Sequence, residues 1–155
     1  MDFLALREVQ IAETVKTLEA CNALTEGYGL TLSSAQALAL AQRRVEALRL
    51  TDRVEFGEGI LKKLIFSFRS SPYLCQQNYE ETLGELQDIF YHFKNESDQS
   101  LTDDELIEFM RSTFDGKAQG SLEYLAGTAL DRLCRELRGW EPDEDEPWEE
   151  DENGE

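Results

Sequence analysis

The stretch from Lys94 to Glu105 is the part of this chain whose residue types and spacing come closest to those of a metal site. In the twelve-residue register of an EF-hand calcium loop, Glu96 takes position 3, Asp98 position 5 and Glu105 position 12. Position 1 is Lys94 instead of a carboxylate, and position 6 is Gln99 instead of the glycine that the sharp turn needs. Binding of a divalent ion or small ligand by this degenerate EF-hand-like loop at residues 94–105 is therefore an alternative hypothesis.

The same loop has a simpler explanation as the start of a helix. Thr102 and Glu105 form the pattern T-x-x-E, in which each side chain accepts a hydrogen bond from the other residue's backbone N–H. Asp103 and Asp104 place negative charge in the first turn, where the helix dipole favours it. The sequence therefore predicts a capped helix after Thr102, and this explains the acidic residues without a metal.

Catalytic chemistry has few residues available. His92 is the only histidine, and its position off the apolar stripe of its helix predicts an exposed side chain. Cys21, Cys75 and Cys134 are widely spaced and odd in number, which favours reduced thiols in the cytoplasm over disulfides or a zinc site. The chain lacks the motifs G-x-x-x-x-G-K-S/T, G-x-G-x-x-G, H-E-x-x-H and G-x-S-x-G. We therefore expect no enzymatic activity, no metal and no cofactor.

Basic residues concentrate between positions 39 and 75, where seven basic and four acidic side chains give a net charge of +3. We expect two consecutive helices to bring them together across the turn between those helices. The hypothesis is a patch that docks an acidic protein partner, or transiently the acidic end of the chain; solvated charge on helix faces is the alternative. The residues of this predicted patch are Arg43, Arg44, Arg49, Arg53, Lys62, Lys63 and Arg69.

The remaining charge is strongly acidic, and the whole chain carries a net charge of −18. Residues 76–115 contain eleven acidic and two basic side chains, a net of −9, and residues 141–155 contain ten acidic and no basic ones. We expect a polarised body with a basic and an acidic region. This balance disfavours direct binding of DNA or RNA, because phosphate contacts need clustered lysines and arginines. A third hypothesis is an acidic protein that competes with nucleic acid for a basic partner.

Apolar residues recur at helical spacing along most of the chain, and no segment alternates long enough to indicate a sheet. Ser33 with Gln36 predicts a second capping box, and Ser121 starts the last helix. Gly84 lies inside the helix predicted over residues 79–93 and predicts the close approach of a neighbouring helix. The expected buried stripe of the last helix is Leu122, Leu125, Ala129, Leu133 and Leu137.

These patterns predict an all-α fold, a compact bundle of five to six helices. Residues 1–140 are expected to form a single helical domain, and residues 141–155 a disordered acidic tail, because like charges and two prolines oppose folding there. The N-terminal residues are charged where a signal peptide needs an apolar run, and no window approaches eighteen apolar residues. We therefore expect a soluble cytoplasmic protein.

Several sequence blocks together resemble an uncharacterised bacterial family of small acidic helical proteins, known as a domain of unknown function. The blocks are RVEFGEGILKKLIF, SPYL, NYEETLGELQDIFYHFKNES, LTDDELIEFM and FDG followed by QGSLEYLAG, and they lie between about Cys21 and Arg138. The resemblance implies no activity, ligand or catalytic residue, and the chain after Gly139 lies outside it.

The leading functional hypothesis is a non-enzymatic protein–protein interaction module without a cofactor. It depends on the lack of a competent catalytic constellation together with a charged, densely helical body. The identity of the protein partner and the oligomeric state stay open, since an apolar helix face such as residues 60–68 can serve a core or a dimer.

Overall fold

The computed structural model describes residues 3–55, 59–97, 100–137 and 139, and within these ranges every regular element is helical. The elements are α1 (Phe3–Thr25), η1 (Glu26–Tyr28), α2 (Ser34–Leu50), α3 (Leu61–Phe68), η2 (Gln76–Asn78), α4 (Tyr79–Glu96), α5 (Asp103–Asp115), α6 (Leu122–Tyr124), η3 (Leu125–Leu130) and α7 (Asp131–Leu137). Since α6, η3 and α7 follow one another without a gap, they form one helical segment. The predicted all-α fold of five to six helices is confirmed, and the predicted tail at residues 141–155 lies outside the described residues.

Local side-chain bonds start two of the main helices as predicted. The Ser33 hydroxyl accepts from the Gln36 backbone N–H at 3.1 Å, and the Gln36 side chain accepts from the Ser33 N–H at 2.9 Å. Thr102 and Glu105 make the same reciprocal pair at 3.1 and 2.9 Å. Each box satisfies two backbone donors that the first turn of a helix leaves free.

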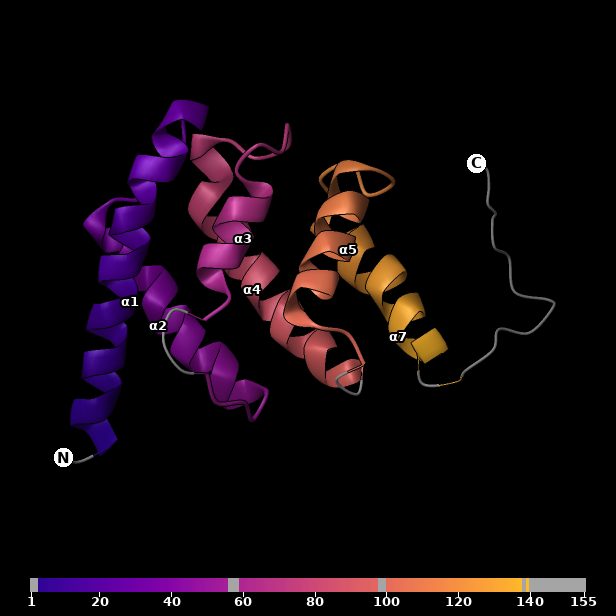
Figure 1. Cartoon of the computed structure of the whole chain (residues 1–155), viewed down its shortest axis with the longest axis horizontal. Helices are drawn as coiled ribbons and strands as arrows, with labels where there is room; N and C mark the ends of the chain where they lie inside the picture. Colours follow the sequence, from indigo (N-terminus) through magenta and orange to yellow (C-terminus); the bar gives the residue numbers. More distant parts are fainter. Residues whose placement is uncertain (1–2, 56–58, 98–99, 138, 140–155) are drawn as a thin grey trace.

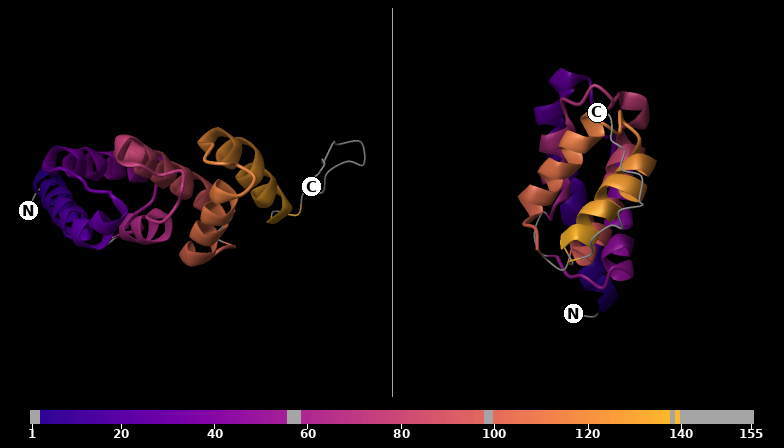
Figure 2. Two further views of the ribbon diagram at one scale, coloured as in Figure 1. Left: turned by 90° about the horizontal axis from the view of Figure 1, so that it is seen from above. Right: turned by 90° about the vertical axis from the view of Figure 1, so that its right-hand side faces the viewer.

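Helix α4 is the central element of the array. It contacts α2, α3, α5 and α7, whereas α1 packs on α2 and α3. Helices α1 and α2 are antiparallel, because Ser34 at the start of α2 bonds Glu19 while Arg44 further along bonds Thr14. Figure 1 shows α1 and α7 at opposite ends of the array, and the view from above in Figure 2 agrees.

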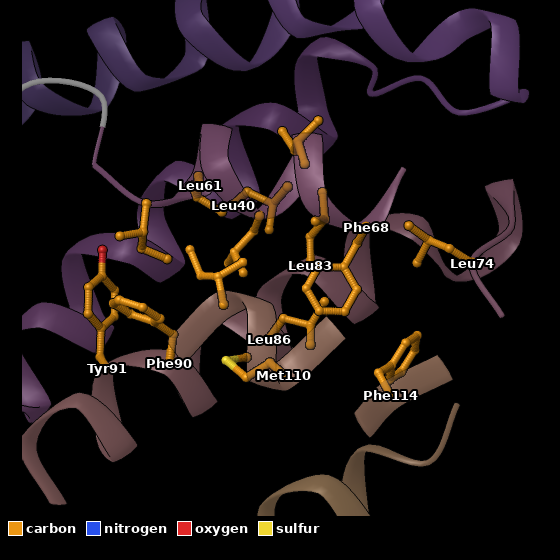
Figure 3. Close-up of a cluster of buried hydrophobic side chains, with 14 of the residues drawn as sticks. Leu40, Leu61, Phe68, Leu74, Leu83, Leu86, Phe90, Tyr91, Met110 and Phe114 are labelled. Atoms are coloured by element: carbon orange, nitrogen blue, oxygen red, sulfur yellow. The ribbon is translucent and has the colours of Figure 1, made fainter. Parts of the chain in front are cut away.

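The buried core is continuous from α1 to α7. Figure 3 shows Phe68 of α3, Leu83 and Phe90 of α4 and Met110 of α5 converging between the helices. Phe68 also meets Phe114 edge to face, with ring centroids 5.4 Å apart. Burial of side chains of this size contributes about 1.5–3 kcal/mol each, so this core supplies the main drive for helix association.

Gly84 lies where α2 approaches α4, as its position inside a helix predicted. A Cβ atom placed there would lie 2.6 Å from Arg43 Nη1 and 2.8 Å from Arg43 Cδ. The missing side chain lets the arginine cross the surface of α4 and reach Asp88 one turn further on, at 2.9 Å. The close neighbour is therefore an arginine side chain and not the backbone of α2.

The predicted buried stripe of the last helix is only partly correct. The structure buries Leu125, Leu130 and Cys134 completely, whereas Leu122 and Leu133 are partly buried against the core, Ala129 is partly covered and Leu137 is exposed. Residues 125–130 form a π-helical turn, whose i→i+5 bonding inserts one extra residue. The extra residue moves the buried face one position along the sequence, from 129 and 133 to 130 and 134.

We predict that Gln87→Leu stabilises the protein. Gln87 on α4 is completely buried, and among the described residues neither its side-chain oxygen nor its nitrogen has a hydrogen-bond partner. Replacing an unsatisfied buried amide with an apolar group of similar size should raise the free energy of unfolding by about 1–2 kcal/mol. Urea denaturation measures this, with the exposed Gln42→Leu as the control, for which we expect a change within about 0.5 kcal/mol. A loss of stability in Gln87→Leu would contradict the unsatisfied state of this amide.

Candidate interaction surfaces

The residues of the predicted basic patch do not form one exposed patch. Arg44 is only 4% exposed and lies inside the helix array, so it cannot belong to a surface patch. Helix α2 ends at Leu50, so Arg53 lies in the connection that follows it and not on the helix. The other basic residues are spread over several sites along α2, α3 and the turn after α3.

Two of these basic residues pair with the acidic segment 76–115. Arg43 lies 2.9 Å from Asp88 on α4, and Lys63 lies 2.8 Å from Asp104 on α5. Both pairs are partly exposed to solvent, so each contributes at most about 1 kcal/mol. Their main consequence is for the surface potential. Packing places part of the basic segment directly on the acidic one, so opposite charges cancel locally. The expected separation into a basic and an acidic region is therefore partly neutralised in the fold.

Buried Arg44 and partly buried Glu55 form an ion pair, with Arg44 Nε 2.9 Å from Glu55 Oε1. Arg44 also donates to Thr14 on α1 at 2.9 Å, and Tyr91 on α4 donates its hydroxyl hydrogen to the same Glu55 oxygen. Burial raises the pKa of Tyr91 above its usual value, and the negative charge of Glu55 raises it further. The pair therefore joins α1, α2, α4 and the connection between α2 and α3.

Lys94 occupies the first position of the degenerate calcium loop and is almost completely buried. Its ammonium donates to the Leu101 carbonyl oxygen and lies 3.0 Å from Asp103 Oδ1. The Lys94 ammonium thus bonds oxygens of Leu101 and Asp103 at the start of α5. In an EF-hand, the residue at this first loop position is instead a carboxylate that binds the metal ion. Asp98 and Gln99 of the predicted loop lie outside the described residues, which contain no group of three or more histidine, cysteine, aspartate or glutamate side chains that could hold a metal.

The side chains considered for nucleophilic chemistry lie apart from one another along the chain. His92 is exposed, as predicted, and its ring meets Phe93 edge to face at 4.6 Å. Cys21 and Cys134 are buried, Cys75 is exposed, and none of the three forms a disulfide. Cys134 donates weakly to the Phe93 carbonyl oxygen at 3.7 Å, so it serves the packing of α7 on α4.

Arg69 organises an exposed aromatic surface that the sequence analysis missed. Its guanidinium lies 4.8 Å from the ring centre of Phe66 and 5.3 Å from that of Tyr28, and it donates to the Leu24 carbonyl oxygen at 3.0 Å. Leu24, Tyr28 and Phe66 are 40%, 52% and 43% exposed. We call these four residues the Arg69 cluster. Phe66 falls off the buried face of α3 (residues 61, 64, 65 and 68), and this was the available sequence signal.

A groove lies between the first half of α1, the second half of α2 and residues 53–55. It has a volume of about 330 Å³, and its apolar walls come from Leu6, Val45, Leu48 and Val54. Arg7, Arg49 and Arg53 also line it, while Arg44 and Glu55 lie at its inner side and balance each other's charge. We call this feature the arginine groove. Two residues of the predicted patch, Arg49 and Arg53, therefore belong here, whereas Arg69 belongs to the separate aromatic cluster.

The chain belongs to a family of unknown function (DUF6323), whose model matches residues 17–142. The predicted resemblance over about Cys21 to Arg138 is thus confirmed, and the match continues three residues beyond Gly139. No curated protein and no solved structure matches the chain. Among the described residues, none of the helices combines the length and the apolar character needed to cross a bilayer.

We predict that Lys94→Met destabilises the protein by about 2 kcal/mol, because a buried charge-assisted hydrogen bond and an ion pair at the start of α5 are lost. Lys63→Met is the matched control: Lys63 binds the neighbouring Asp104 in an exposed position, so its loss should cost less than about 1 kcal/mol. Urea denaturation of both variants measures the difference. Equal losses in the two variants would contradict the structural role assigned to Lys94.

Proposed function

We propose that this chain is a non-enzymatic protein–protein interaction module of the cytoplasm, and that the Arg69 cluster is its contact surface. The observation that carries the proposal is the gathering of three exposed apolar residues around one guanidinium. Scattered exposed apolar residues are ordinary on a protein surface, but a cluster of them is typical of a binding site.

The composition of the Arg69 cluster supports a protein partner. Tyrosine, phenylalanine and arginine are enriched at the centres of protein interfaces, and truncation of tyrosine or arginine there often costs most of the binding energy. Stacking on two rings holds the Arg69 guanidinium in place, so little side-chain entropy is lost when it binds a carboxylate. The expected partner therefore presents a carboxylate beside an apolar side chain.

The alternatives have less support. The ammonium of Lys94, which bonds the oxygens of Leu101 and Asp103, weighs against a divalent ion in the 94–105 loop. Competition with nucleic acid for a basic partner depends mainly on residues 141–155, which lie outside the described residues, and it stays a prediction. The lack of a disulfide among the three cysteines is consistent with the proposed cytoplasmic location.

A photo-crosslinking amino acid at position 66 tests the contact surface in cells. We expect a discrete cross-linked complex with position 66, and none with the same amino acid at the exposed position of Glu108 on α5. Arg69→Glu, introduced beside the crosslinker, should reduce the yield about tenfold, which corresponds to a loss of about 1.4 kcal/mol of binding free energy.

Lys117→Glu is the matched charge reversal on an exposed residue outside the cluster, and it should leave the yield unchanged. Circular dichroism confirms that each variant keeps its helices. Equal cross-linking from positions 66 and 108, or a yield unaffected by Arg69→Glu, would contradict the proposal.

A further inference from the structure

We propose that the arginine groove binds the acidic end of this same chain, residues 141–155, with Trp148 seated against its apolar walls. The inference is independent of the proposed function, because the Arg69 cluster is a different surface made by α3, η1 and the end of α1. It assigns an occupant to a groove whose composition differs from that of the rest of the protein.

Charge complementarity is the first argument for this occupant. The residues that line the groove include four arginines and one glutamate, a net charge of +3 in a chain whose total is −18. Arg44 and Glu55 neutralise each other, and Arg49 is paired with Glu46 on the exposed face of α2 at 2.5 Å. Arg7 and Arg53 therefore provide most of the attraction for an anionic ligand. Residues 141–155 carry ten carboxylates and no basic side chain, the densest negative charge in the sequence.

The apolar walls provide the second argument. Leu6 and Val54 are 48% and 78% exposed, so the groove leaves a large apolar area in contact with water. A purely acidic segment would not cover this area, but residues 141–155 contain Trp148 among their carboxylates. An indole ring can bury roughly 200 Å² of surface, and its N–H can remain at the rim. The segment therefore matches both the charge and the apolar character of the groove.

The segment starts after α7, which packs on the same end of α4 as the groove, although α7 and α1 lie at opposite ends of the array. Cys134 of α7 contacts the Phe93 carbonyl oxygen on α4, and Arg53 of the groove donates to the Asn95 side chain at 2.6 Å. Phe93 and Asn95 lie two residues apart near the end of α4, so α7 and the groove meet the same end of this helix. Figure 1 shows the C-terminal ends of α2, α4 and α7 in the lower part of the array.

The reach of the chain is sufficient for the contact. Helices α7, α4, α2 and α1 pack in series, so the groove between α2 and α1 lies up to about 30 Å from α7 at the usual spacing of 8–10 Å for each helix pair. The eleven residues from 138 to 148 span up to about 36 Å when extended. Trp148 can therefore arrive at the groove without any change in the helices.

Bound in this way, residues 141–155 exclude other acidic ligands from the groove. A competing partner must displace them, so its apparent affinity equals its intrinsic affinity multiplied by the fraction of molecules in which the groove is free. Because the attraction is largely electrostatic at partly exposed sites, added salt weakens it.

Tryptophan fluorescence of the full-length chain tests the proposal. Trp140→Phe leaves Trp148 as the only tryptophan, and its emission then reports whether the ring is covered. At 10 mM salt, where screening extends over about 30 Å, we expect blue-shifted emission with protection from acrylamide. At 1 M salt, where screening acts within about 3 Å, the shift and the protection should be lost. Emission typical of exposed tryptophan at both salt concentrations would overturn the proposal.

Two groove variants show where the ring is bound. Arg7→Glu/Arg49→Glu reverses two exposed charges of the groove, and Val54→Asp changes an apolar wall at an exposed position, so each should abolish the blue shift at low salt. Lys62→Glu/Lys117→Glu makes the same total change in charge elsewhere and should retain the shift. Equal loss in the groove and control variants would overturn the assignment to the groove. A shift that depends on protein concentration would assign the contact to a second copy and would equally overturn it.

Discussion

The ion pair between buried Arg44 and partly buried Glu55 is the interaction on which the arrangement of the N-terminal half depends. Burial of two charges is costly unless both are paired and hydrogen-bonded. Here Glu55 accepts from Arg44 and Tyr91, and Arg44 also donates to Thr14. The bond to Tyr91 connects the pair to α4, and the bond to Thr14 connects it to α1. Gly59 is part of this arrangement: its φ is +68°, and a Cβ atom there would lie 2.1 Å from Glu55 Oε1. The same pair forms the inner side of the arginine groove, so it also fixes the distance between the groove walls on α1 and α2.

The helices could be predicted from sequence where their signals are local. The capping boxes at Ser33 and Thr102 involve residues three positions apart, so the pattern and the structure agree. The π-helical turn at residues 125–130 has no such local signal, because it is favoured by the burial of Leu130 and Cys134 against other helices. Periodicity alone therefore predicted the helix but assigned its buried face only in part.

The residues of the predicted basic patch are separated in the fold for a related reason. Composition shows how many arginines and lysines a segment has, but their partners are set by tertiary structure. Arg43 binds a carboxylate 45 residues away, and Lys63 binds one 41 residues away. The remaining arginines divide between two surfaces of different chemistry, one aromatic around Arg69 and one apolar and concave at the arginine groove. The division lets one small fold present the proposed partner-binding surface and, separately, the groove proposed to bind its own acidic segment.

A double-mutant cycle on this ion pair tests the central claim most directly. Arg44→Met and Glu55→Gln should each lower the free energy of unfolding by about 3 kcal/mol, because each leaves a buried or partly buried group without its charged partner. If the pair organises the fold as described, the double variant should lose less than the sum of the two by about 2 kcal/mol. Urea denaturation of the four proteins gives these values. Losses that add within about 0.5 kcal/mol would contradict the account, because they would show that the two side chains act independently.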